Sequence, residues 1–284
     1  MDSRLTQAIR IENTRHVSIE PYEGEVVAGS HYLGRFLTTW IGSFQEFILL
    51  AGRAFLNVVR RPHYYDDVFL QMDAIGIGSI PITLLIGAFS GAIIALQMSR
   101  ALNTYGASSQ VGSIVALTLV RELGPVLTAL LVAGRNASGI ASELGSMKVT
   151  EQIDAMRALG TDPVQKLVTP RLMATALMLP CLTVIADAVG LFGAYLVAVP
   201  LLHIISAGSY WSTSWRALVL NDLAQGLMKP FLFGIIISLV GCFYGLRTTG
   251  GTQGVGRATT QAVVVASIWI FFVTFLIDKI FVNL

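Results

Sequence analysis

The chain has 284 residues, of which 54% are hydrophobic and only 13% charged, and its formal net charge is +2. Its mean hydropathy is +0.68. Soluble domains carry about a quarter charged residues, so this composition excludes an ordinary soluble protein. The basic residues are spread along the chain and form no single patch, which argues against nucleic-acid binding. We therefore expect an all-α integral membrane protein.

The N-terminal region divides into two parts. Residues 1–30 carry charges throughout and no apolar core of a signal peptide, which predicts a polar cytoplasmic tail. Over residues 31–61, apolar side chains recur at spacings of three and four, as in an amphipathic helix. We expect this helix to lie in the membrane interface with Arg60 and Arg61 near anionic headgroups, and to end before Pro62. A core helix of a small soluble domain is the alternative. The apolar stripe consists of Leu33, Leu37, Trp40, Phe44, Phe47, Ala51, Phe55 and Val58.

Five apolar runs follow, each near the length of about 20 residues that a helix needs to cross the hydrocarbon core. Their apolar residues are continuous and do not alternate with polar ones, so they predict helices and exclude the strands of a membrane barrel. Lys and Arg concentrate before the first run, between the second and third, and between the fourth and fifth, which predicts a cytoplasmic N-terminus. The predicted spans are 74–98, 111–134, 172–202, 230–246 and 258–277.

A pair of charges, Arg121 and Glu122, interrupts the second run. Charges inside a membrane are expensive unless they are partnered or wetted, so the pair is a functional-site hypothesis. Pro125 has no N–H, and the carbonyl of Arg121 therefore lacks its helical partner, which indicates a polar cavity. The planar guanidinium of Arg121 suits a lipid phosphate, and Glu122 would restrain it. A structural salt bridge between helices is the alternative.

The longest connection between spans follows the second run. Its pattern predicts one amphipathic helix over 143–159, with apolar side chains on one side and charged side chains available to a partner. Asp162 is expected to cap a second helix that starts at Pro163, with Gln165 closing a capping box. Together these helices predict a rigid cytoplasmic projection. A solvated loop without a partner is the alternative.

The chain has no nucleotide-binding or catalytic signature of its own. It contains no Gly-Lys-Ser or Gly-Lys-Thr that would end a P-loop, so ATP hydrolysis would fall to a separate subunit. The histidines show neither metal-ligand spacing nor a catalytic constellation. We expect a non-catalytic membrane subunit that binds no cofactor or metal. The histidines are His16, His31, His63 and His203.

The later spans contain isolated polar residues. Asp187 lies near the centre of the third span, where we expect it to partner Arg121 or a lysine across a dimer; a satisfied structural carboxylate is an equal alternative. We interpret Asp278, at the end of the fifth span, as an interfacial side chain that reaches towards water. Cys181 and Cys242 are interpreted as small buried hydrophobic residues and not as a disulfide.

Two glycine pairs, Gly87 with Gly91 and Gly241 with Gly245, place small residues one helical turn apart. Such pairs let two helix backbones approach closely. We expect them to serve packing within the chain and not a seam between two copies.

Several motifs occur in one order along residues 74–277. They are Arg121-Glu122-Leu123-Gly124-Pro125, Ala133-Gly134-Arg135, Ser142-Glu143-Leu144-Gly145-Ser146-Met147, Thr150-Glu151-Gln152-Ile153-Asp154-Ala155-Met156, Asp162-Pro163 and Gly254-Val255-Gly256-Arg257-Ala258-Thr259. With this series, the chain resembles the permease subunit of the MlaE family. Some relatives have an aspartate where this chain has Thr274, so the resemblance assigns no lipid-pocket role to Asp278.

The resemblance implies a homodimeric permease of an ABC-type phospholipid transporter in the bacterial inner membrane. Family members pair with a cytoplasmic ATPase and with an MCE-domain substrate-binding protein. The residues expected to bind lipid are Arg121, Glu122 and Asp187. The residues expected to couple to the ATPase are Glu143, Glu151, Gln152, Ile153 and Asp154.

Two other classes of function stay open at this point. An ion-coupled secondary transporter would use Glu122 and Asp187 as its coupling carboxylates, although no repeated halves are evident. A membrane scaffold that transports nothing would bind partners but no lipid, and the central charge pair argues against it.

Overall fold

The computed structural model describes residues 23–60, 62 and 64–282, with side chains over 41–60, 62 and 64–281. Within these ranges the chain is helical apart from short connections and contains no strand, which confirms the all-α prediction. The chain divides into two compact units, Met1–Ile48 and Leu49–Leu284, which are described separately.

The described helices include one 3-10 segment, η1, and four π-helical segments, η2 to η5. In chain order the elements are α2 (Glu23–Val59), α3 (Tyr65–Thr104), η1 (Ser108–Gln110), α4 (Val111–Thr118), η2 (Leu119–Leu123), α5 (Gly124–Val132), η3 (Ala133–Ala137), α6 (Ser138–Val149), α7 (Gln152–Ala158), η4 (Val164–Val168), α8 (Thr169–Leu196), η5 (Val197–Leu201), α9 (Ala207–Ala217), α10 (Leu220–Leu246) and α11 (Gly251–Val282).

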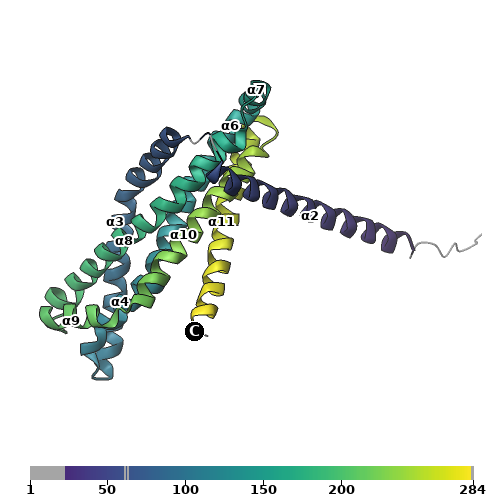
Figure 1. Cartoon of the computed structure of the whole chain (residues 1–284). Coiled ribbons are helices and arrows are strands. Elements are labelled where there is room, and N and C mark those ends of the chain that lie inside the picture. The colour runs from purple at the N-terminus through teal and green to yellow at the C-terminus, as the bar shows by residue number, and fades with distance from the viewer. Residues whose placement is uncertain (1–22, 61, 63, 283–284) are drawn as a thin grey trace, which may run out of the picture. The chain divides into compact units, whose positions relative to one another are not determined.

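Five helical runs of the described residues are long and apolar enough to cross a membrane, which confirms the predicted number of spans. Each run begins before its predicted start, because charged and polar residues precede the apolar stretch in the same helix. The first, second and fifth runs also continue past their predicted ends, whereas the fourth ends at Leu246 as predicted and the third ends at Leu201, one residue earlier. In Figure 1, α6 and α7 lie at one end of the second unit, and α4 and α9 lie at the other. The runs are Tyr65–Thr104, Ser108–Val149, Val164–Leu201, Leu220–Leu246 and Gly251–Phe281.

Helix α2 begins at Glu23, inside the segment predicted as a tail, so that boundary is wrong. It ends at Val59, before Pro62, as predicted. Several of its large apolar side chains are exposed, among them Phe44 and Leu56. Its place in the membrane interface stays a prediction. Residues 1–22 and Arg61 lie outside the described residues.

Glycines bring the helices of the second unit into close contact. A Cβ on Gly91 would lie 1.9 Å from the carbonyl oxygen of Gly190, so only glycine lets α3 approach α8 this closely. Gly87 meets Ala186 of α8 in the same way. On α10, a Cβ on Gly245 would meet α6 at 2.8 Å, from the Cβ of Leu144. Intramolecular packing by both glycine pairs is confirmed, because Gly241 also meets α6.

The two cysteines are free. Cys242 is buried in α10, as expected, whereas Cys181 lies exposed on α8. The interpretation of Cys181 as a buried residue is therefore wrong, because its side of α8 is not covered by the described residues.

The helix predicted over 143–159 is two helices. Glu151 has a left-handed backbone (φ 59°), which ends the regular run between α6 and α7. Beyond α7, the Asp162 carboxylate accepts a hydrogen bond from Val164 N at 2.9 Å, which confirms the predicted cap. The Gln165 amide donates instead to the Pro62 carbonyl at 2.9 Å, so the predicted capping box is wrong.

Candidate functional site

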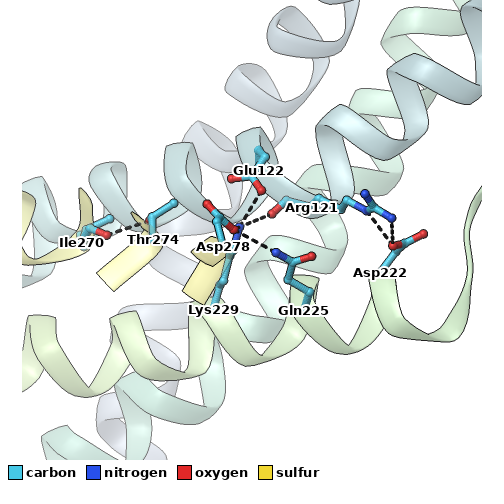
Figure 2. Close-up of polar contacts among 8 residues, drawn as sticks. All are labelled: Arg121, Glu122, Asp222, Gln225, Lys229, Ile270, Thr274 and Asp278. Atoms are coloured by element: carbon cyan, nitrogen blue, oxygen red, sulfur yellow. Dashed lines mark hydrogen bonds and ion pairs between the residues drawn. The ribbon is translucent and has the colours of Figure 1, made fainter. Parts of the chain in front are cut away.

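Six polar residues from three helical elements meet near the end of the unit where α10 begins and α11 ends. Figure 2 shows their side chains directed towards one another. We call this group the polar cluster; it comprises Arg121 and Glu122 of η2, Asp222, Gln225 and Lys229 of α10, and Asp278 of α11.

Lys229 is the centre of the cluster, and its side chain is 0% exposed. Its Nζ lies 2.8 Å from Glu122 Oε1 and 2.5 Å from Asp278 Oδ1. It also donates to the carbonyl oxygen of Arg121 at 2.8 Å. Pro125 leaves that carbonyl without a helical donor, so the buried ammonium supplies what the proline removes. Three acceptors offset the large desolvation cost of a fully buried cation.

Arg121 forms the second ion pair of the cluster. Its Nε donates to Asp222 Oδ1 at 2.6 Å, and its terminal nitrogen contacts the same oxygen. The other oxygen of Asp222 accepts from Val219 N at 3.0 Å, which caps the first turn of α10. Arg121 and Glu122 each pair with α10, so both connect helices, as the structural alternative predicted.

The cluster opens on a pocket of about 180 Å³, which confirms the polar cavity predicted from the freed carbonyl. The Arg121 side chain remains 46% exposed, whereas that of Asp222 is 3% exposed. The cluster holds more carboxylates than cations. Lys229 forms ion pairs with both Glu122 and Asp278, and Arg121 pairs with Asp222. The charged groups therefore face a polar pocket. Its lining includes Arg121, Glu122, Asn221, Asp222, Gln225, Asp278 and Phe281.

Asp187 does not join the cluster. It is buried, and its Oδ1 has no hydrogen-bond partner among the described residues. This oxygen lies 1.7 Å from where a Cβ on Gly124 would be, so the carboxyl group packs on the backbone of α5. Within the chain Asp187 does not pair with Arg121, because that guanidinium is held by Asp222 of α10, so this expectation is wrong. A pairing with a lysine across a dimer stays a prediction.

Asp278 has a larger role than its position at a helix end predicted. It accepts from Lys229 and also from Gln225 Nε2 at 2.9 Å. The interpretation as an interfacial side chain is therefore wrong. Thr274, one turn earlier on α11, donates to the carbonyl of Ile270 in its own helix at 2.8 Å (Figure 2). In this chain, α11 contributes its carboxylate at Asp278.

Sequence reasoning missed three members of the cluster: Asp222, Gln225 and Lys229. The predicted fourth span began at 230, so these residues were assigned to a loop. Their spacing of three and four residues places them on one face of a helix, and this signal could have found them. The helix begins at Leu220, ten residues before Pro230.

The turn between α6 and α7 presents a second set of predicted residues. Glu151, Gln152 and Asp154 are exposed, whereas Ile153 is fully buried. Ile153 therefore anchors α7, and its side chain is not available to a partner. Asp154 pairs with Lys148 at 2.7 Å and with Arg157, and the Lys148 hydrogen bond lowers the pKa of its carboxyl group.

Glu143, the remaining residue predicted to couple, lies on α6 itself. Its carboxylate pairs with Arg171 of α8 at 2.7 Å, and the Arg171 side chain is 4% exposed. Glu143 therefore connects α6 to α8, while half of its own surface stays accessible.

The fold and the polar pocket define the class of protein: a helical membrane protein in which buried ion pairs connect the spans. A family model described as Permease MlaE matches residues 68–280, and the chain belongs to this family. The match covers all five spans.

Individual relatives agree with this assignment. The chain is 39% identical over 251 residues to a probable ABC transporter permease protein of Rickettsia typhi, covering 88% of this chain and 96% of the relative. It is 36% identical to the chloroplastic protein TRIGALACTOSYLDIACYLGLYCEROL 1 of Arabidopsis thaliana, covering 82% of this chain and 66% of the relative. It is 35% identical to the intermembrane phospholipid transport system permease protein MlaE of Haemophilus influenzae, covering 83% and 93%. The ion-coupled alternative finds no support in these relatives.

Proposed function

We propose that this chain is the membrane permease subunit of an ATP-driven transporter that moves phospholipids between membranes. The observation that carries the proposal is the polar cluster, whose charges open on a pocket between otherwise apolar helices. Membership of the MlaE permease family supports it, as does a relative named for intermembrane phospholipid transport.

The half-exposed guanidinium of Arg121 is the group we expect to receive a lipid phosphate. Asp222 holds the guanidinium from one side and leaves part of it accessible to the pocket. A planar fork of donors suits phosphate oxygens. Lys229 is fully buried and paired with Glu122 and Asp278, so Arg121 is the cation of the cluster whose side chain is exposed to the pocket.

The turn between α6 and α7 is where we expect the ATPase subunit to act. The exposed Glu151, Gln152 and Asp154 would form the contact, while Ile153 keeps α7 anchored. Helix α6 packs against both α10 and α11, which carry Lys229 and Asp278 at their far ends. A push on α7 would therefore be passed to the polar cluster through packed helices.

The assembly that follows from this function has further components. We expect two copies of this chain in the bacterial inner membrane, with the N-terminus in the cytoplasm. A separate ABC ATPase would bind and hydrolyse ATP, and an MCE-domain protein would exchange lipid with the permease. The chain itself would be non-catalytic.

The lipid-binding role is tested by Arg121→Ala in the purified complex. We expect less co-purified phospholipid, because the substitution removes the accessible phosphate donor. Arg216→Ala is the matched control, since Arg216 is an exposed arginine on α9 at the same end. Lipid extraction and quantitative mass spectrometry measure the content. Equal lipid content in wild type and Arg121→Ala would leave Arg121 with a structural role only.

The coupling role is tested by Glu151→Lys and Asp154→Lys. Both reverse an exposed charge on the turn, and we expect ATP hydrolysis to continue without lipid movement. Asp66→Lys is the control, because Asp66 is an exposed carboxylate in the first turn of α3. The ratio of lipid transferred to ATP hydrolysed, in reconstituted vesicles, is the measurement. Wild-type ratios in both turn variants would refute the assignment.

A further inference from the structure

The accessible charges of the polar cluster are of both signs. The side chains of Arg121, Glu122 and Asp278 are 46%, 41% and 30% exposed, and all three line the pocket. Lys229 is fully buried and Asp222 nearly so. A ligand in this pocket therefore meets one guanidinium and two carboxylates.

The two accessible carboxylates share a single ammonium group. The Nζ of Lys229 contacts Glu122 Oε1 at 2.8 Å and Asp278 Oδ1 at 2.5 Å, so the two acids lie side by side. Gln225 Nε2 also donates to Asp278, but it reaches the same oxygen, at 2.9 Å. These donors leave the second oxygen of each carboxylate unused. Since like charges at short range repel, a further positive group beside the two acids would be stabilising.

The guanidinium lies on the other side of the cluster. In Figure 2 it extends from Arg121 towards Asp222, while Glu122 and Asp278 gather around Lys229. The pocket thus has a positive side and a negative side. A complementary ligand carries an anionic group for the guanidinium and a cationic group for the carboxylates.

The charge balance of the cluster disfavours a lipid whose headgroup is only anionic. Carboxylates outnumber cations by one in the cluster, and all of them belong to helices that cross the apolar core. A headgroup with a phosphate alone would add a negative charge to a site that is already negative, which is costly where water is scarce. A headgroup with an ammonium beside its phosphate adds no net charge.

A primary ammonium fits the negative side best. It has three N–H donors, which match the unused carboxylate oxygens, whereas a trimethylated ammonium has none. The pocket measures about 180 Å³ and has Phe281 in its wall, so a compact headgroup suits it. Leu223 of α10 and Ile280 of α11 are exposed beside the pocket residues in the chain, and acyl chains would find apolar surface there.

We propose that this pocket selects a zwitterionic phospholipid with a primary ammonium, such as phosphatidylethanolamine. Its phosphate would bind Arg121, and its ammonium would bind Glu122 and Asp278. The inference rests on the proposed function, because it concerns the same lipid site. It gives the two carboxylates a role in specificity besides their role in holding Lys229.

The test uses the full chain in mild detergent, titrated with phosphatidylethanolamine or phosphatidylglycerol of identical acyl chains and followed by native mass spectrometry. A charge-assisted hydrogen bond changes binding by about tenfold, so we expect at least about a tenfold preference for phosphatidylethanolamine in the wild type. Glu122→Gln should lose most of this preference, by weakening phosphatidylethanolamine and not phosphatidylglycerol. Asp66→Asn, which removes an exposed carboxylate outside the pocket, should keep the preference. Circular dichroism and gel filtration check that both variants stay folded.

The wild-type comparison needs no substitution, and equal affinity for the two lipids would overturn the inference. Arg121→Ala then separates this failure from a failure of the proposed function. If Arg121→Ala weakens both lipids, the phosphate role of Arg121 stands without a headgroup preference. If it changes neither lipid, the proposed lipid site fails as well.

Two further ligands define the chemistry of the bound group. Phosphatidylcholine should bind more weakly than phosphatidylethanolamine, because its ammonium has no N–H; equal binding would overturn the assignment to a primary ammonium. Free phosphoethanolamine in millimolar excess should not displace the lipid, because it lacks acyl chains. Full displacement would indicate a site for a soluble amine phosphate and would also overturn the inference.

Discussion

The polar cluster and a second pocket, which Arg247 and Arg257 line at the other ends of α10 and α11 and which we call the basic pocket, both involve these two helices. Lys229 in the first and Arg257 in the second differ in how their charges are partnered. In the polar cluster, a fully buried Lys229 is held by two carboxylates and a backbone carbonyl. In the basic pocket, Arg257 is exposed and has no partner among the described residues. The difference shows that burial decides whether a charge must be neutralised inside the chain, because water or lipid headgroups can serve an exposed one.

The largest expected effect is that of Lys229→Met. The substitution leaves Glu122, Asp278 and the Arg121 carbonyl without their shared donor, and breaking a buried pair in this way costs about 3–5 kcal/mol. We expect a large fall in the thermal unfolding temperature of the detergent-purified protein. Arg257→Met, in the basic pocket, should change stability by less than about 0.5 kcal/mol.

Equal unfolding temperatures of Lys229→Met and Arg257→Met would contradict the conclusion that burial decides whether a charge must be neutralised inside the chain. A second variant keeps the Lys229 prediction sharp. Adding Asp278→Asn to Lys229→Met removes one of the abandoned charges, so the double variant should be more stable than Lys229→Met alone.

A smaller effect is expected at Asp222, which pairs with a half-exposed arginine. Asp222→Asn keeps an acceptor for Val219 N but loses the ion pair, and it should destabilise the protein by about 1 kcal/mol. Asp222→Ala also removes the cap, which should add about 1 kcal/mol. Thermal unfolding of the two variants separates the contributions. Equal unfolding temperatures would show that the cap contributes nothing.

The smallest effect concerns the exposed ion pairs of Asp154 at the α6–α7 turn. The Lys148 hydrogen bond lowers the pKa of Asp154, so these pairs stabilise the turn above the ordinary carboxyl pKa of about 4. This contribution is lost as the pH falls through the lowered value. Hydrogen exchange of Gln152–Ala158 at pH 6 and pH 3 should show the loosening, after correction for intrinsic rates. Asp154→Asn should show little difference between the two; a full pH response in Asp154→Asn would assign the loosening to other groups.

The number and type of the spans could be predicted from the sequence because about 20 apolar residues are needed to cross a bilayer. The polar cavity beside Arg121 could also be predicted, since Pro125 frees a carbonyl whatever surrounds it. The identity of the partners could not. Lys229 and Arg121 are distant in the sequence, and only the packing of α10 against η2 brings them together.

The predictions for Asp187, Asp278 and the helix over 143–159 were wrong because each depends on how the helices are oriented in the folded chain, which the sequence pattern does not determine. The approach of Asp187 to Gly124, and not to Arg121, depends on how α8 is rotated, which periodicity alone does not determine. Asp278 looked like a residue at a membrane surface because helix ends carry such residues. The division of α6 from α7 depends on the backbone of Glu151, a residue type that gives no turn signal.

One helical run, Ser108–Val149, joins the two ends of the molecule, since it carries Arg121 near its beginning and meets the α7 turn at its end. It contains two π-helical segments, η2 and η3, with α5 between them. Wider turns of this kind are places where helices bend. The run can therefore bend at η2 and at η3. A displacement at the α7 turn would reach Arg121 as a change in the angle between the segments of this helix and not only as a translation along it.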